Sequence, residues 1–263
     1  MDLCLKSKIA LVTAASQGLG KAAAFSLARE GVKLIICSRN KEGILRAASE
    51  IKRETGSMVI PVIADVSKYA DIRKLGTIIK RKFGTVHILV NNAGGPPTGD
   101  ILTMTDADWS KGVELTLMSV VRLSREVLPH MLKQKWGRII TITSIAGKQP
   151  INDLIVSSTL RPGIHGLTKV LSNKFAGHNV TVNTVCPGNI LTSRQRELME
   201  QRSAKQKIST DDYMEQTTKD IPAGRLGKPE EIGDVIAFLA SEKASYINGV
   251  NLLVDGGMAK GIF

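Results

Sequence analysis

A small-residue turn between an apolar run and a helix-forming segment is the stretch of this chain best suited to bind a phosphate. Ile9–Val12 is apolar, the turn spans Thr13–Gly20, and the segment that continues to Gly31 has the spacing of a helix. Gly18 and Gly20 carry no Cβ, so the backbone can pass close to a ligand. The helix presents free N–H groups and its positive dipole end toward the same place. This order of strand, turn and helix predicts dinucleotide binding through the pyrophosphate, with a plain tight turn as the alternative.

The end of the second apolar run carries an arginine and no carboxylate. In dinucleotide-binding folds an acidic residue at this place hydrogen-bonds the ribose 2′-hydroxyl. Ser38 and Arg39 stand there instead, and a guanidinium can pair with a 2′-phosphate. NADP(H) is therefore favoured over NAD(H), and a solvated loop arginine is the alternative.

Three further loops follow apolar runs and could line the same ligand, because parallel strands bring their carboxyl ends to one edge of a sheet. Asp65-Val66 could accept a bond from an adenine amino group or cap the next helix. In Asn91–Gly94 the amides could brace neighbouring loops and the small residues leave room for a ribose. Pro187–Thr192 is a rigid turn whose free backbone groups could hold a carboxamide.

The elements that must position these loops alternate between strand and helix. The predicted strands, mostly apolar runs, are Ile9–Val12, Val32–Cys37, Met58–Ala64, His87–Asn91, Arg138–Thr143, Val180–Cys186 and Val250–Val254. The predicted helices after the first are 41–55, 69–83, 107–134 (entered through a short helix near Trp109), 159–175 and 229–241. Pro162 should lie in the first turn of its helix or kink it. The pattern predicts an α/β fold: one Rossmann-like domain over 1–263, a doubly wound parallel sheet with helices on both faces.

Composition narrows the class of partner. The net charge is +12, but the basic residues are dispersed and only 4% of residues are aromatic, so we expect no nucleic-acid binding and an anionic cofactor or substrate instead. No apolar run approaches the ~20 residues of a membrane span. Cys4, Cys37 and Cys186 have no metal-ligand spacing, and the last two lie in strand-like runs. We expect no metal, no membrane association and a reduced, cytoplasmic setting.

Several short motifs carry a family resemblance over essentially the whole chain. They are TAASQGLG at 13–20, DV at 65–66, NNAG at 91–94, GRIITITS at 137–144, PGNILT at 187–192, GRLGKPEEI at 224–232 and VDGG at 254–257. In order and spacing they resemble the short-chain dehydrogenase/reductase family, in particular its β-ketoacyl carrier-protein reductases. The resemblance implies a single Rossmann-like domain, a nicotinamide cofactor, and a homotetramer or homodimer.

The resemblance also implies catalytic positions, and this chain departs from the family there. The family uses a serine to orient the carbonyl, a tyrosine as acid, a lysine that holds the ribose, and an asparagine in a proton relay. Ser144 matches the serine, whereas Ser157 stands at the tyrosine position and Arg161 at the lysine position. Thr116 stands at the asparagine position, and Ala14 replaces the first glycine of the turn.

These departures leave the source of the proton open. A serine hydroxyl is shorter and far less acidic than a phenol, which titrates near ~10. Arg161 can hold a ribose and supply positive charge, but with a pKa above ~12 it cannot relay a proton. The acid could be Ser157, a water, or a residue such as Tyr213 of the polar helical segment 193–222, predicted to form a substrate lid. His165, one turn after Arg161, is more readily explained as a packed or interface residue.

The expected function is therefore an NADP(H)-dependent oxidoreductase acting on a carbonyl or alcohol, a small molecule or a 3-oxoacyl thioester. A catalytically inactive nucleotide-binding sensor or scaffold is the alternative. The predicted catalytic residues are Ser144, Ser157 and Arg161. The predicted cofactor-binding residues are Ala14, Ser16, Gln17, Gly18, Leu19, Gly20, Ser38, Arg39, Asp65, Val66, Asn92, Ala93, Gly94, Arg161, Pro187, Gly188, Ile190 and Thr192.

Overall fold

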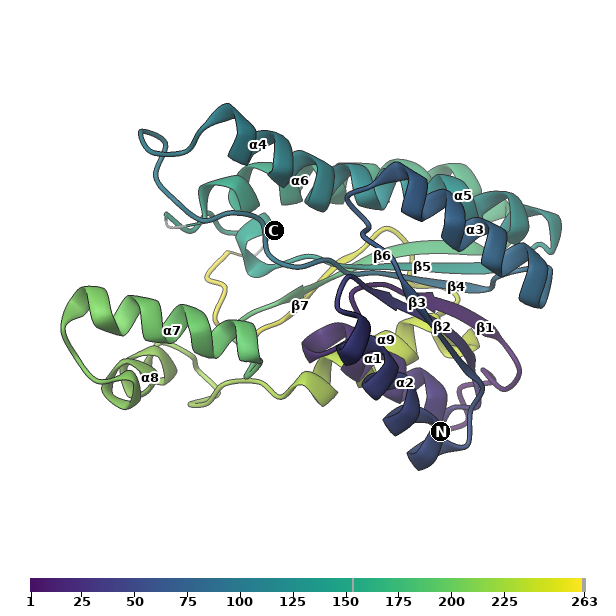
Figure 1. Ribbon diagram of the computed structural model, residues 1–263, viewed down its shortest axis with the longest axis horizontal. Coiled ribbons are helices and arrows are strands. Elements are labelled where there is room, and N and C mark those ends of the chain that lie inside the picture. The colour runs from purple at the N-terminus through teal and green to yellow at the C-terminus, as the bar shows by residue number, and fades with distance from the viewer. Residues whose placement is uncertain (153, 262–263) are drawn as a thin grey trace.

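In the part of the chain that the structure describes, seven parallel strands form one sheet through the middle of the molecule (Figure 1), in the spatial order β3-β2-β1-β4-β5-β6-β7. The computed structural model describes residues 1–152 and 154–261, so residues 153, 262 and 263 of the predicted domain lie outside the described residues. The strand order reverses between β1 and β4, and a ligand is expected at the carboxyl ends of the strands beside such a reversal. The strands are β1 Ile9–Val12, β2 Lys33–Ser38, β3 Val59–Ile63, β4 Ile88–Asn91, β5 Gly137–Ile142, β6 Val180–Pro187 and β7 Asn251–Val254.

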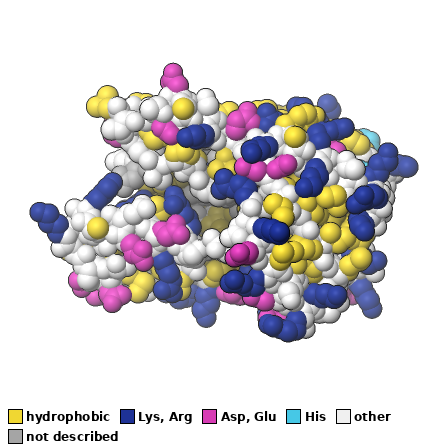
Figure 2. Space-filling view, in the orientation of Figure 1, with side chains coloured by type: hydrophobic (Ala, Val, Ile, Leu, Met, Phe, Trp, Pro, Cys, Tyr) yellow, Lys and Arg dark blue, Asp and Glu magenta, His cyan; other side chains and the backbone are white. Residues whose placement is uncertain are grey.

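Helices cover both faces of the sheet, which confirms the predicted doubly wound α/β fold (Figure 1). Helices α1, α2 and α9 lie on one face, and α3, α4, α5 and α6 on the other. Helices α7 and α8 stand apart, and Figure 2 shows a hollow between them and the rest of the molecule. Within the described ranges, none of the helices combines the length and hydropathy that crossing a membrane requires. The helices are α1 Gly18–Arg29, α2 Lys41–Thr55, α3 Tyr69–Phe83, α4 Asp106–Gly112, α5 Ser119–Lys133, α6 Ile155–Phe175, α7 Ser193–Gln206, α8 Thr210–Lys219 and α9 Pro229–Ala240.

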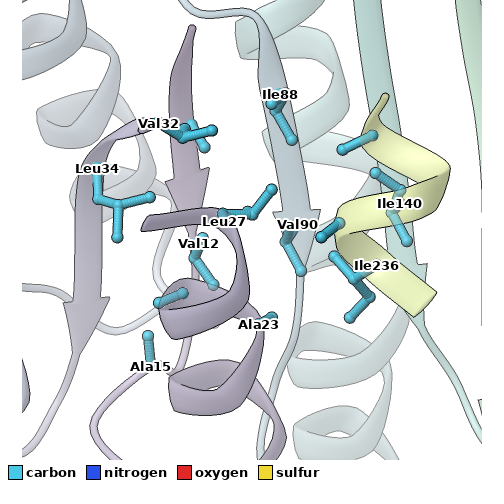
Figure 3. Packing of buried hydrophobic residues seen from close by; sticks show 14 of the residues in the cluster. Val12, Ala15, Ala23, Leu27, Val32, Leu34, Ile88, Val90, Ile140 and Ile236 are labelled. Carbon is cyan, nitrogen blue, oxygen red and sulfur yellow. The ribbon is translucent and has the colours of Figure 1, made fainter. Parts of the chain in front are cut away.

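The apolar runs of the strands are continuous because each strand feeds two cores. Successive strand residues point to opposite faces, so Leu11 packs with the α3 and α5 side while Val12 packs with α1 and α9. Figure 3 shows Val12 and Val90 of the sheet against Leu27 of α1 and Ile236 of α9. Cys37 is fully buried on the α3 side, and burial raises the pKa of its thiol to about 12.

Helix α6 begins earlier than predicted. It starts at Ile155 and not near Thr159, so Pro162 lies inside the helix, and the first alternative, Pro162 in the first turn, was wrong. Val156 and Ser157 are buried, and this packing overrides the poor helix propensity of Pro162. As a result Ser157 and Arg161 are one turn apart on the same face of α6.

The long helical region predicted over 107–134 is divided into three segments. Helix α4 contains Trp109, as expected, and a π-helical turn over Val113–Met118 separates it from α5. Such turns inside helices are often found at functional sites. Leu115 of this turn reaches the cavity described next.

Candidate active site

A cavity of about 660 Å³ opens at the carboxyl ends of the strands, where the loops after β1 to β6 meet. Every residue predicted to bind the cofactor lines it except Gly20. Among the residues that the structure describes, no cluster of three or more histidine, cysteine or acidic side chains could hold a metal ion.

The turn after β1 is fastened to the end of β4. Thr13 Oγ1 donates to the Asn92 carbonyl at 2.6 Å and accepts from the Asn92 backbone N–H at 2.9 Å. The Asn92 side-chain Nδ2 donates to the Ala14 carbonyl at 3.2 Å. Gly20 packs against the side of this turn that faces away from the cavity, where a Cβ would stand 2.5 Å from the Ala14 carbonyl oxygen. Its missing side chain therefore lets α1 approach the turn and does not line the cavity.

Ala14 adopts a left-handed backbone with φ of +47°. An L-residue has a strain of about 1–2 kcal/mol in this conformation, which glycine lacks. The greater flexibility of glycine in the unfolded chain offsets part of that gain, so Ala14→Gly is expected to raise the free energy of unfolding by about 0.5–1 kcal/mol in urea titrations. Ala107→Gly in exposed helix α4 is the control and should lower it by about 1 kcal/mol. Equal destabilisation by both changes would contradict this account of the turn.

The loops after β2 and β3 form one side of the cavity. Ser38 Oγ donates to Ser16 Oγ at 3.0 Å, and Arg39 extends past them with its side chain 68% exposed and Nη1 4.0 Å from Asp65. Asp65 Oδ1 accepts from the backbone N–H and hydroxyl of Ser67. Burial alone would raise the pKa of the Asp65 carboxyl, but these hydrogen bonds outweigh it and the pKa falls below its usual value. Asp65 thus stabilises its own turn, and the residue at the start of α3 is Lys68, which has no side-chain cap.

Of the three predicted catalytic residues, Ser144 and Arg161 line the other end of the cavity, and Ser157 contacts Arg161 from behind it. Ser144 follows β5 and accepts from the Ala146 backbone N–H at 3.1 Å, so its own O–H remains free to donate. Ser157 is buried and accepts from Arg161 Nε at 2.7 Å. Arg161 Nη1 also donates to the Ile142 carbonyl at 3.4 Å. The structure therefore brings these side chains together, with a guanidinium between the sheet and α6.

Arg161 has no acidic partner among the described residues, in which no carboxylate lies within ion-pair distance of it. Desolvation lowers the pKa of its guanidinium to about 10, so the group is still cationic at neutral pH. It is an unneutralised positive charge facing the cavity.

A second cavity of about 350 Å³ adjoins the first. Its walls come from the loop 95–98, the start of α6, and the helices α7 and α8, which contribute Leu198, Tyr213 and Thr217. Ser157 lines this second cavity only, whereas Ser144 and Arg161 line both.

His165 is a packed residue, which confirms that interpretation. It is buried, its Nε2 lies 3.2 Å from Thr143 Oγ1 and 3.6 Å from Cys186 Sγ, and it lines neither cavity. Burial, together with the charges of Lys148 and Arg161, lowers the pKa of its imidazole to about 4. A neutral ring at that depth cannot serve as the acid near neutral pH.

Some lining residues were not predicted. Of these, Gly95, Arg194 and Gln195 line both cavities. Arg194 belongs to the segment 193–222 that was predicted to form a lid, but it was not among the predicted site residues. A usable signal existed: Thr192 caps α7 by accepting from the Gln195 N–H, which places the first helical turn at the edge of the cavity.

Comparison with known proteins now identifies the family. The family model described as "Enoyl-(Acyl carrier protein) reductase" matches residues 13–259. The chain belongs to the short-chain dehydrogenase/reductase family. It is 38% identical to the 3-oxoacyl-[acyl-carrier-protein] reductase FabG of Escherichia coli (strain K12) over 253 residues, covering 96% of this chain and 98% of the relative. The FabG protein of Thermotoga maritima is 32% identical and is covered to 98%.

Solved structures agree with this membership in the short-chain family. The L-sorbose reductase of Gluconobacter frateurii, in complex with NADPH and L-sorbose, matches with a TM-score of 0.95 at 30% identity, with both chains covered completely. Actinorhodin polyketide ketoreductase with NADPH matches with a TM-score of 0.93 at 33% identity, covering 97% of this chain and 98% of that one.

Proposed function

We propose that this protein is an NADP(H)-dependent oxidoreductase that transfers a hydride between the nicotinamide and a carbonyl or alcohol substrate, small or carried as a 3-oxoacyl thioester. The observation that carries the proposal is the meeting of two cavities at Ser144 and Arg161. The first is large enough for a dinucleotide, and the second adjoins it where a substrate carbonyl would have to lie. The reductase names of the relatives support the same class of reaction.

The first cavity suits a nicotinamide dinucleotide. Gln17 precedes α1 without a side-chain cap, and the first turn of α1 has no acidic residue, so its N–H groups remain available for a pyrophosphate. Ser38 and Arg39 would hold a 2′-phosphate, Asp65 and Val66 the adenine, the loop 92–94 a ribose, and the loop 187–192 the nicotinamide.

The chain's own residues would act on the substrate oxygen. The cofactor supplies the hydride. Ser144 donates its free O–H to the carbonyl oxygen, and Arg161 stabilises the negative charge that develops there. Arg161 also holds the Ser157 oxygen as an acceptor, which leaves the Ser157 proton free to point into the second cavity. The final proton comes from Ser157, from water or from the lid.

The lid, the domain and the assembly are part of the same proposal. Residues 193–222 would cover the substrate, because α7 and α8 form one wall of the second cavity. The chain would act as a single catalytic domain and assemble as a homotetramer or homodimer.

Turnover tests the proposal. The protein is mixed with NADPH and a panel of 3-oxoacyl thioesters, diketones, oxo acids and sugars, and the absorbance of the reduced nicotinamide is followed. Oxidation with at least one substrate is expected. Tight NADPH binding without oxidation by any member would instead favour a nucleotide-binding sensor or scaffold.

The proposed 2′-phosphate site makes a separate prediction. Arg39→Ala is expected to weaken NADPH binding about 10- to 100-fold, because a charge-assisted contact is lost, and to leave NADH binding unchanged. Calorimetric titration of both cofactors measures this, with Arg46→Ala on the exposed face of α2 as the control. Wild-type protein that binds NADH as tightly as NADPH would remove the stated preference.

A further inference from the structure

The place where the two cavities meet is positively charged. The residues that line both cavities are Gly95, Ser144, Arg161, Gly188, Arg194 and Gln195. Arg161 and Arg194 are the charged members of this set, and both are cationic. Hydride transfer in the proposed function takes place at this junction, so the reacting carbonyl would lie between two guanidinium groups.

Neither guanidinium is neutralised by a strong partner. Arg161 has no ion pair in the part of the chain that the structure describes, and two of its nitrogens donate to neutral oxygens. Arg194 pairs with Glu197 of its own helix at 3.6 Å, and the two side chains are 45% and 56% exposed. A solvated pair of this kind contributes little. The Arg194 guanidinium extends from α7 to Gly95 on the opposite wall, where a Cβ would lie 3.7 Å from its Nε.

The second cavity is also lined by basic side chains. Among the described residues, the other charged side chains that line it are Arg202 and Asp220. Figure 2 shows Lys and Arg side chains at the rim of the hollow beside the lid helices. Arg161 would stabilise the developing charge on any carbonyl oxygen, but a neutral ketone has no second group for Arg194, whereas a carboxylate would be held there by charge-assisted bonds in a fork geometry.

We propose that the substrate is an oxo acid, a carbonyl compound with a carboxylate close to the reacting carbonyl. Arg194 binds the carboxylate, while Arg161 and Ser144 face the carbonyl oxygen. This inference rests on the proposed function and specifies its substrate class. A hydride from the reduced nicotinamide forms the new C–H bond, the C=O π electrons move to oxygen, and a proton completes the hydroxyl. The nicotinamide is oxidised, the ketone is reduced, and the carboxylate is unchanged.

Matched pairs of substrates test this assignment. Short 2-oxo and 3-oxo acids are compared with their own amides, which keep the carbonyl and lose the charge. Wild-type protein is expected to prefer the acid by about 10- to 100-fold in kcat/KM. Arg194→Met should abolish that preference by lowering kcat/KM for the acids far more than for the amides, Arg194→Lys should restore part of it, and Arg196→Met, which lines neither cavity, should behave as wild type.

A binding measurement separates failure of this inference from failure of the proposed function. The oxo acid is titrated by calorimetry into the complex with oxidised cofactor, where no reduction can occur. Binding that depends on Arg194 supports the oxo-acid site even if the turnover panel shows no reaction. Equal kcat/KM for acids and amides would overturn the inference. So would an Arg194→Met variant whose main defect is a higher Kd for NADPH, because Arg194 would then bind the cofactor and not the substrate.

Discussion

Replacing Arg161 by methionine is expected to lower kcat/KM for carbonyl reduction about 100- to 1000-fold, the loss typical of removing a preorganised oxyanion donor. Arg161 and Arg194 both line the two cavities, and of the two it is Arg161 that donates from Nε to Ser157 Oγ at 2.7 Å. Methionine has a similar length but no charge and no donor. Steady-state oxidation of NADPH, measured with the preferred substrate of the panel, gives the effect.

Two controls separate chemistry from folding in this experiment. Arg161→Lys keeps a charge with fewer and shorter-reaching donors and should retain more activity than methionine does. Because Arg161 has no acidic partner among the described residues, its removal leaves no carboxylate unpaired, and the melting temperature should change little. Full activity of Arg161→Met would remove the role assigned to this residue.

Replacing Ser144 by alanine is the second large effect that we expect. The Ser144 oxygen accepts from the Ala146 N–H, so its proton is directed away from that contact and is free for the substrate oxygen. Loss of this donor should lower kcat about 100-fold or more. Alanine also removes the cap of the short 3₁₀ turn over Ile145–Gly147, at a cost of about 0.5–2 kcal/mol in stability.

Ser144→Thr distinguishes the two consequences of that change. Threonine keeps the hydroxyl and the cap, so Ser144→Thr should retain much of the activity. Ser144→Ala in an otherwise stabilised variant of the protein should stay impaired, because added stability does not replace the lost donor. Both are measured as kcat at saturating NADPH, together with the melting temperature. Ser144→Ala with full kcat would show that the carbonyl is oriented by another group.

Much of the fold could be predicted because local signals and tertiary packing agree. Helix α2 begins and ends where predicted, since Asn40 caps it by accepting from the Gly43 N–H and Gly56 ends it with φ of +71°. Helix α3 likewise ends at Gly84, with φ of +72°. At α6 the two disagree, because Pro162 opposes a helix while the packing of the buried first turn, with Val156 and Ser157, favours one. Packing decides such conflicts, and the sequence does not reveal packing.

The site residues likewise divide into those that the topology places and those that only packing decides. Residues at strand ends, such as Arg39 and Asp65, could be placed because the topology brings those ends together. Gly20 was expected in the wall and lies behind it, since the same glycine pattern serves either contact with a ligand or close packing. Arg194 was missed as a junction residue because α7 is polar around most of its circumference, and periodicity cannot indicate which side faces the cavity.

Transfer of a labelled hydride tests the central claim most directly. NADPH that carries deuterium at the transferable position of the nicotinamide is incubated with the protein and an oxo acid, and the product is analysed by mass spectrometry and NMR. We predict an alcohol with deuterium on the carbon that held the carbonyl oxygen, and no such product with Arg161→Met at comparable times. Tight binding of NADPH with no label in the product of any carbonyl compound tested would contradict the account.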